Sequence, residues 1–306
     1  MTDLTIIDTR MHGHPGITGA FLVRGEKTAL VETGPKSTVE HVFAGLEEHE
    51  VERLDWIVLT HIHLDHAGAA GTIARRFPEA RVAVHEVGAP HLVDPAKLWK
   101  SAGRIYGDDM ERLWGGIDPI PQDRIEVLRD GDVVDLGGRT LQAFDTPGHA
   151  FHHHAFLDDA TGTLFAGDAL GVRLPDVGFV RPATPPPEFN LELGLESIAR
   201  IKELAPRSVC LTHFGPNTEG VDPRGVEDLC DEAAEALVKW AAWVHEAREQ
   251  TEELDQAAKI VAEHARAAME DKIDERQIER LEQTTSYWMN TWGYMRYLDK
   301  KQQAEA

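Results

Sequence analysis

The segment WIVLTHIHLDHAGAAGTIARRF, residues 56–77, joins a continuous apolar run to a series of small residues. The run WIVLT predicts a strand covered on both faces, and residues 68–77 predict a helix. The turn between them holds four residues of metal-ligand type: His61, His63, Asp65 and His66. Residues two apart in an extended chain point to the same side, so His61 and His63 converge without helical geometry. We interpret this turn as a metal site for zinc, with iron or manganese as alternatives, rather than a solvated polar turn.

Three further ligand-type residues follow other apolar runs. His149 comes after the turn TPG, Asp168 follows the glycine of LFAGD, and His213 ends VCLTH. Each is a weak signal alone. Together they are expected at one edge of the predicted sheets, where the binding sites of layered α/β folds collect.

The rest of the chain shows two regimes. Up to about residue 211, short β-like runs alternate with helical segments, and turn signals at 130–131 and 137–138 predict an antiparallel meander. This pattern predicts an α/β protein with two sheets sandwiched between helices. After about residue 220 the strand signals stop, and three amphipathic helices are predicted, over 229–244, 252–270 and 278–295. The last seven residues are expected to be frayed.

With these motifs the chain resembles the metallo-β-lactamase superfamily: HIHLDH at 61–66, TPGH at 146–149, GD at 167–168 and the late histidine 213. The resemblance covers about residues 4–215 and implies an αββα sandwich with a dinuclear centre at its edge. It implies that one metal is held by His61, His63 and His149. It likewise implies that the second is held by Asp65, His66 and His213, with Asp168 bridging both.

The resemblance also implies a domain organisation. We expect a catalytic domain over residues 1–219 and a helical C-terminal subdomain over 220–306, similar in placement to that of glyoxalase II. An insertion at 88–122 and a Pro-rich loop at 171–190 are expected over the site. The apolar C-terminal helices leave open whether they cap the pocket, form a homodimer interface, or both.

Composition restricts the partners. The chain has 306 residues and a formal net charge of −22, which disfavours binding to nucleic acid or to anionic membranes. We find no signal-peptide pattern and no apolar run of the roughly 20 residues needed to cross a bilayer. Two cysteines are too few for a disulfide framework. We therefore expect a cytoplasmic protein with a small-molecule substrate.

The expected reaction is hydrolysis of a small ester-like bond, a lactone or a thioester, by a hydroxide bridging two zinc ions. In this hypothesis Asp65 takes the proton of the nucleophile and Asp168 orients both ions. The candidate substrate contacts are Tyr106, His152, His153, Phe179 and Arg181, of which Arg181 would hold a carboxylate or phosphate. An equally weighted alternative is that the tryptophans of the insertion form no pocket wall and only pack the insertion against the body of the protein.

Three alternatives stay open. Sulfur dioxygenases of the same superfamily use one iron at the first site, although the complete second set of ligands favours two metals. A phosphodiesterase is the next alternative, and a non-catalytic binding protein is the third. A glutathione thioester is disfavoured, because TPGHAFHHHAF departs from the H-x3-H spacing familiar in glyoxalase II.

Overall fold

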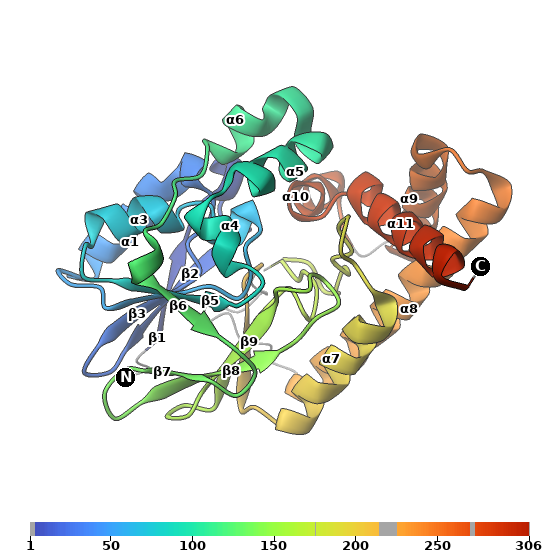
Figure 1. The fold of residues 1–306 in the computed structure, drawn as a ribbon. Helices are drawn as coiled ribbons and strands as arrows, with labels where there is room; N and C mark the ends of the chain where they lie inside the picture. The colour runs from blue at the N-terminus through green and yellow to red at the C-terminus, as the bar shows by residue number, and fades with distance from the viewer. Residues whose placement is uncertain (1–3, 175, 214–224, 270–272, 306) are drawn as a thin grey trace.

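Two β-sheets lie face to face at the centre of the molecule, with helices over the outer face of each (Figure 1). A computed structural model describes residues 4–174, 176–213, 225–269 and 273–305. The first sheet has the order β1-β2-β3-β4-β5-β6. Its strands are Leu4–Asp8, Gly19–Arg24, Thr28–Val31, Trp56–Val58, Arg81–His85 and Ile125–Leu128. β1 to β3 are antiparallel, and β3 to β6 are parallel.

The second sheet has the order β11-β10-β9-β8-β7. From β7 to β11 its strands are Val133–Asp135, Thr140–Asp145, His154–Asp158, Thr163–Gly167 and Ser208–Leu211. The pair β10–β11 is parallel, and the other pairs are antiparallel. The predicted meander is therefore only partly right. β6 pairs in parallel with β5, and the turn at 130–131 carries the chain from the first sheet to the second.

Alternation along the strands produces the layers. Within β2, Phe21 and Val23 pack between the two sheets, whereas Ala20 and Leu22 pack on the opposite side with the helices of the first sheet. Successive strand residues point to opposite faces, so a continuous apolar run is what a strand covered on both faces requires. The αββα sandwich expected from the sequence is confirmed.

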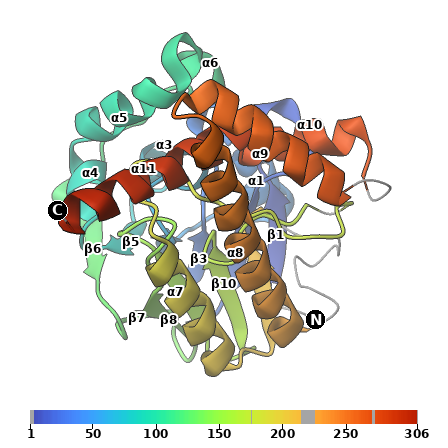
Figure 2. The same ribbon diagram turned by 90° about the vertical axis from the view of Figure 1, so that its right-hand side faces the viewer.

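Helices cover both outer faces. α1 (Val39–Glu48) and α3 (Ala70–Arg76) pack on the first sheet. On the second sheet lie α7 (Leu191–Leu204) and α8 (Val226–Gln250), which stand in front of β10 in Figure 2. Shorter helical turns are η1 (Met11–Gly13), η2 (Lys36–Thr38), α2 (Leu64–Ala67) and η4 (Gln122–Arg124).

The insertion at 88–122 forms α4 (Ala89–Val93), α5 (Ala96–Tyr106), η3 (Gly107–Asp109) and α6 (Met110–Trp114). Trp114 is buried and packs in one cluster with Met11 and Leu64 of the body. Asp118 accepts hydrogen bonds from Lys36 and from the helix α3 side chain of Thr72. Trp114 therefore packs the insertion against the body of the protein, and Asp118 adds polar contacts.

The C-terminal region is helical, as expected: after α8 come α9 (Leu254–Met269), α10 (Glu275–Thr284) and α11 (Tyr287–Glu305). The single helix predicted over 278–295 is two helices. Thr285 is extended between them, its hydroxyl donating to Asn290 and its carbonyl accepting from Arg181. The tail expected to fray is part of α11. The expected boundary at residues 219–220 lies outside the described residues.

Helix α11 holds the Pro-rich loop. Asn290 donates through Nδ2 to the carbonyl of Pro182 at 2.7 Å and accepts from the Thr184 amide at 2.9 Å. One turn later, Gly293 lets the helix approach the loop: a Cβ built there would lie 1.9 Å from the Thr184 oxygen. Within the described residues, no helix is long and apolar enough to cross a membrane.

We expect Gly293→Ala to destabilise the protein by about 1–3 kcal/mol, because the added methyl overpacks this contact. Urea unfolding followed by circular dichroism measures the change. Gly103→Ala is the matched control, since this helical glycine has its nearest neighbour 4.0 Å from a built Cβ. The control should be neutral or slightly stabilising. Equal effects of the two substitutions would contradict the close approach of α11 to the loop.

Candidate metal centre

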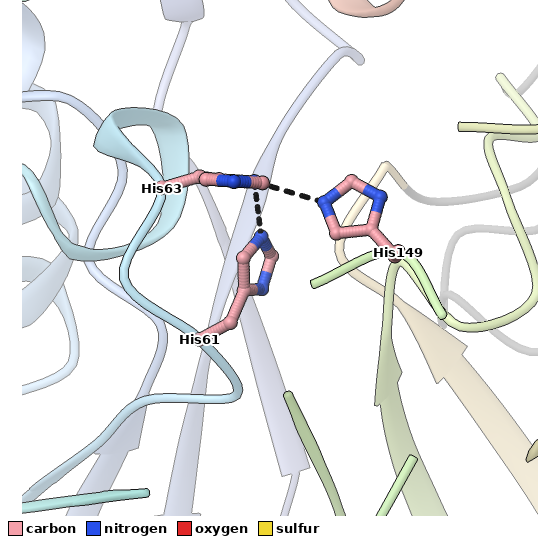
Figure 3. A group of neighbouring side chains, drawn as sticks. All are labelled: His61, His63 and His149. Carbon is pink, nitrogen blue, oxygen red and sulfur yellow. Dashed lines mark hydrogen bonds between the residues drawn. The ribbon is translucent and has the colours of Figure 1, made fainter. Parts of the chain in front are cut away.

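Three histidines meet at the edge of the sandwich. His61 and His63 follow β4, and His149 follows β8, so the ends of strands from both sheets bring them together. Nδ1 of His63 lies 2.9 Å from Nε2 of His61 and 2.9 Å from Nε2 of His149. Figure 3 shows the three rings pointing toward one another.

Hydrogen bonds on the far side of two rings fix their tautomers. The Thr60 hydroxyl donates to Glu32, so it accepts from Nδ1 of His61. Nδ1 of His149 donates to the carbonyl of Ala183 at 3.1 Å. The Nε2 atoms of both rings therefore aim lone pairs at Nδ1 of His63, which carries at most one proton. One proton on His63 cannot satisfy both lone pairs. A cation among the three rings would satisfy them better than hydrogen bonds between the rings do.

Burial keeps these rings neutral. It lowers the pKa of His63 to about 3, with a further contribution from His149, and lowers the pKa of His61 well below its ordinary value. Burial also lowers the pKa of His149. Neutral imidazole is the form that ligates zinc and similar ions.

A second group lies beside the first and contains Asp65, His66 and His213. Oδ2 of Asp65 is 3.6 Å from Nε2 of His66 and 3.4 Å from Nε2 of His213. Nδ1 of His213 faces the carbonyl of Ile17 at 3.0 Å, which leaves Nε2 for the group. Nε2 of His66 is buried and has no hydrogen-bond partner.

In the second group, the carboxylates and the imidazole rings stabilise each other's charged forms despite burial. Burial opposes the charged form of His66, but Asp168, Asp65 and Glu32 outweigh it and raise the pKa well above its ordinary value. Burial likewise favours protonated Asp65, yet His66 and His213 hold its pKa below the usual range. Carboxylates that favour a proton on these rings equally favour a divalent cation between them.

Asp168 lies between the two groups. Its Oδ1 is 3.4 Å from Nε2 of His66, and its Oδ2 is 3.4 Å from Nε2 of His149. Oδ1 is also buried without a hydrogen-bond partner. One carboxylate thus presents a separate oxygen to each group, which is one of the arrangements in which a carboxylate can bridge two cations.

His153 supports Asp168 instead of facing the substrate. Its Nε2 accepts the backbone N–H of Asp168 at 3.1 Å, and its Nδ1 donates to Thr146 at 2.7 Å. Gly167, with φ at 53°, permits this turn, since a Cβ there would lie 2.5 Å from Nε2 of His153. His153 is fully buried and does not line the cavity of the site, so the structure does not place it where the predicted substrate contact requires.

The sequence interpretation missed Glu32. This buried residue follows β3 with φ at 65° and accepts from Nδ1 of His66 at 3.1 Å, from Thr60 and from Thr212. Such a carboxylate orients a ligating imidazole and increases its basicity. The signal was present: Glu32 follows an apolar strand, as do Asp168 and His213.

A cavity of about 420 Å³ opens beside both groups, and Asp65, His149 and Asp168 reach its wall. The insertion contributes Leu98 and Tyr106, the Pro-rich loop contributes 185–187, and Thr284, Thr285 and Met289 come from the C-terminal region. The C-terminal region therefore forms part of the wall. Of the predicted substrate contacts, Tyr106 and His152 line this cavity.

Phe179 and Arg181 lie elsewhere. Both line a second cavity, of about 260 Å³, against α8 and α9. The guanidinium of Arg181 is buried, bonds Glu282 at 2.6 Å, and lies 4.3 Å from the ring centre of Tyr287. Arg181 ties the loop to the C-terminal region and does not line the cavity of the metal centre, where its predicted role of holding a substrate anion would place it.

A third histidine–carboxylate cluster, His85, Asp145 and His154, needs no metal. Nε2 of His154 lies 2.8 Å and Nε2 of His85 lies 3.5 Å from Oδ1 of Asp145. Nδ1 of His85 accepts from the Val87 amide, so its proton is on Nε2 and faces the carboxylate. The hydrogen bond from His154 to Asp145 holds this cluster together without a metal ion. His12, expected not to be a ligand, bonds Gln283.

The fold and the histidine–carboxylate site together indicate the family to which the protein belongs. Residues 15–213 match the family model described as the metallo-beta-lactamase superfamily, and the chain belongs to that family.

Particular relatives extend the likeness. The chain is 32% identical over 206 residues to the metallo-beta-lactamase fold-containing protein ST1585 of Sulfurisphaera tokodaii, covering 66% of this chain and 74% of that protein. A crystal structure of ST1585 superposes with a TM-score of 0.70 over 96% of this chain and 98% of the other. The family protein TTHA1429 of Thermus thermophilus, 21% identical, gives 0.67 over 99% and 95% and shows the same fold.

Other relatives have named activities but match over less of their length. A hydroxyacylglutathione hydrolase of Aeromonas hydrophila is 30% identical, over 49% of this chain and 45% of its own. An atrochrysone carboxyl ACP thioesterase of Aspergillus fumigatus is 28% identical, over 49% and 38%. The chain therefore spans less than half of each of these enzymes.

We expect Glu32→Gln to weaken binding of the Zn²⁺ ion that His66 would hold by roughly 10–100-fold, the usual effect of removing a carboxylate behind a ligating histidine. Titration of the metal-free protein with Zn²⁺ in a competing chelator measures this. Glu126→Gln, which alters an exposed pair with Arg81, should leave both affinities unchanged. Wild-type affinities in Glu32→Gln would contradict the role of Glu32.

Proposed function

We propose that this protein is a dinuclear metal-dependent hydrolase of a small ester-like bond, a thioester or a lactone. The observation that carries the proposal is Asp168, whose two oxygens face two separate donor groups 3.4 Å away. Two of the relatives described above, an atrochrysone carboxyl ACP thioesterase and a hydroxyacylglutathione hydrolase, are consistent with it.

Two zinc ions fit the donor set. His61, His63 and His149 would hold one, and Asp65, His66 and His213 the other, with Asp168 shared. Bound there, the cations would lower the pKa of a water between them from about 15.7 toward about 7 and polarise the carbonyl of the substrate. The attack needs no serine or cysteine nucleophile, and the two free cysteines, Cys210 and Cys230, are both buried.

Asp65 is placed to handle the proton. Its side chain reaches the cavity wall, and its neighbours His66 and His213 keep its pKa low despite burial. An ionised carboxylate beside the nucleophile accepts its proton and passes it to the leaving group. Asp168 contacts both donor groups and fixes their relative position, and His153 positions Asp168 through the backbone N–H of Asp168.

Tyr106 supplies a hydrogen-bond donor. Burial, with the charge of Asp65, raises the pKa of its phenol above the ordinary value, so the hydroxyl stays protonated. Its present acceptor is the sulfur of Met289 at 3.6 Å, a weak partner. An oxygen of the substrate in the cavity would replace that sulfur.

The first test is metal analysis of purified, tag-free protein together with a hydrolysis panel of lactones, thioesters and phosphodiesters. We expect close to two zinc ions per chain and turnover of a thioester or lactone. In Asp168→Asn we expect the metal content to fall below two and the rate to fall by at least about a hundredfold.

Asp158→Asn is not a suitable control, because that carboxylate is buried against Arg139; the exposed Asp135→Asn serves instead. Turnover of phosphodiesters alone would replace the ester assignment. One iron per chain with oxygen uptake on a persulfide would replace the hydrolase with the dioxygenase. Unchanged metal content and activity in Asp168→Asn would contradict the bridging role.

We expect Tyr106→Phe to lower kcat/KM by roughly tenfold, because one hydrogen bond to the substrate is lost. Metal content should stay at the wild-type value, since the phenol is not a ligand in this proposal. Steady-state kinetics on the best substrate of the panel measures kcat/KM, and elemental analysis measures the metal content. A wild-type kcat/KM would show that Tyr106 only packs against the cavity.

A further inference from the structure

Helix α5 has an unusual charge for this chain. Its sequence, AKLWKSAGRIY, contains three cations and no acidic residue, whereas the whole chain carries −22. Lys97, Lys100 and Arg104 are spaced by three and four residues, so they lie along one face of the helix. All three side chains are exposed.

This cationic face belongs to the cavity of the metal centre. Lys97, Lys100 and Arg104 all line the same cavity as Asp65, His149 and Asp168. In the described ranges none of the three makes an ion pair, although many other cations of the chain do, Lys36 with Asp118 and Arg248 with Asp299 among them. Their charges therefore remain available to a ligand.

The spacing of the cations indicates what they would bind. Seven residues of helix span about 10 Å, so the three charges form a short row rather than one point. Several phosphates along one molecule match such a row better than a single carboxylate does. Lysine binds phosphate as a point charge, and arginine binds it through its planar fork.

We propose that α5 binds the phosphate-bearing half of the substrate, a thioester of a polyphosphorylated thiol such as coenzyme A. The acyl half then reaches the metal centre along the apolar wall formed by Leu98, Ile105 and Pro185. This inference rests on the hydrolase proposed above and identifies the class of its substrate.

A small carrier fits better than an acidic carrier protein. The three cations of α5 occupy a single helix, whereas the chain as a whole has a net charge of −22. At physiological salt the charges are screened beyond about 8 Å. A small polyanion at the mouth therefore feels mainly α5, whereas an acidic protein would bring its own charge against the surrounding surface.

The test compares butyryl-coenzyme A with the butyryl thioester of N-acetylcysteamine, which has the same reacting bond and no phosphate. We expect a lower KM for the coenzyme A thioester. In the variant Lys97→Gln, Lys100→Gln, Arg104→Gln this KM should rise roughly ten- to hundredfold. The kcat for both substrates, and the KM for the neutral one, should change little.

A direct binding measurement separates this inference from catalysis. Adenosine 3′,5′-bisphosphate carries phosphates of coenzyme A without the thiol, so calorimetry on the metal-free protein reports on α5 alone. We expect binding that weakens with salt and is lost in the triple variant. The control is Lys259→Gln, Arg276→Gln, Arg296→Gln, three exposed cations on the C-terminal helices whose removal changes the net charge equally.

Each outcome is decisive. Hydrolysis of both thioesters with equal KM, and no bisphosphate binding, overturns the role of α5 and leaves the hydrolase. A glutathione thioester preferred in wild type and triple variant alike does the same. Faster cleavage of an acidic carrier protein's thioester overturns the small carrier. Bisphosphate binding that depends on α5, without hydrolysis of any ester, overturns the hydrolase and retains the phosphate site.

Discussion

One buried carboxylate sets the requirements of this structure. Asp168 faces His66 with one oxygen and His149 with the other, and this single side chain must be placed between donors from both sheets. The backbone turn at Gly167, the imidazole of His153 behind the Asp168 amide, and the Thr146 hydroxyl behind that imidazole all serve this position. An unpaired buried carboxylate is costly, so the site is built for compensating positive charge.

The sequence predicts the site better than it predicts the surroundings. His61 follows β4 of the first sheet, and Asp168 and His213 follow the parallel strands β10 and β11 of the second. The strand-end position of each residue can be read from the sequence, but the packing of the two sheets is what brings them together. Glu32 follows β3 in the same way, but a single glutamate after a strand carries no motif that distinguishes it from a surface carboxylate. The two sheets were likewise readable, since apolar runs such as WIVLT need cover on both faces.

What the sequence did not reveal depends on long-range partners. Arg181 in a Pro-rich loop is indistinguishable from a substrate clamp until Glu282 and Tyr287, about a hundred residues later, are placed against it. The periodicity of 278–295 is that of one helix. Only the bonds from Thr285 to Asn290 and Arg181 reveal a break. His153 stands directly beside His152 in the sequence, yet His153 lies behind Asp168, next to the turn at Gly167, whereas His152 lines the cavity.

The C-terminal helices are connected to the metal centre by a short chain of bonds. His149 donates to the Ala183 carbonyl, and the adjacent Thr184 is held by Asn290 of α11. A cation that binds the folded protein stabilises every segment whose folding fixes its ligands. Occupancy of the centre and the docking of α11 are therefore linked equilibria: each shifts the other by the same free energy, although more than a hundred residues separate them along the chain.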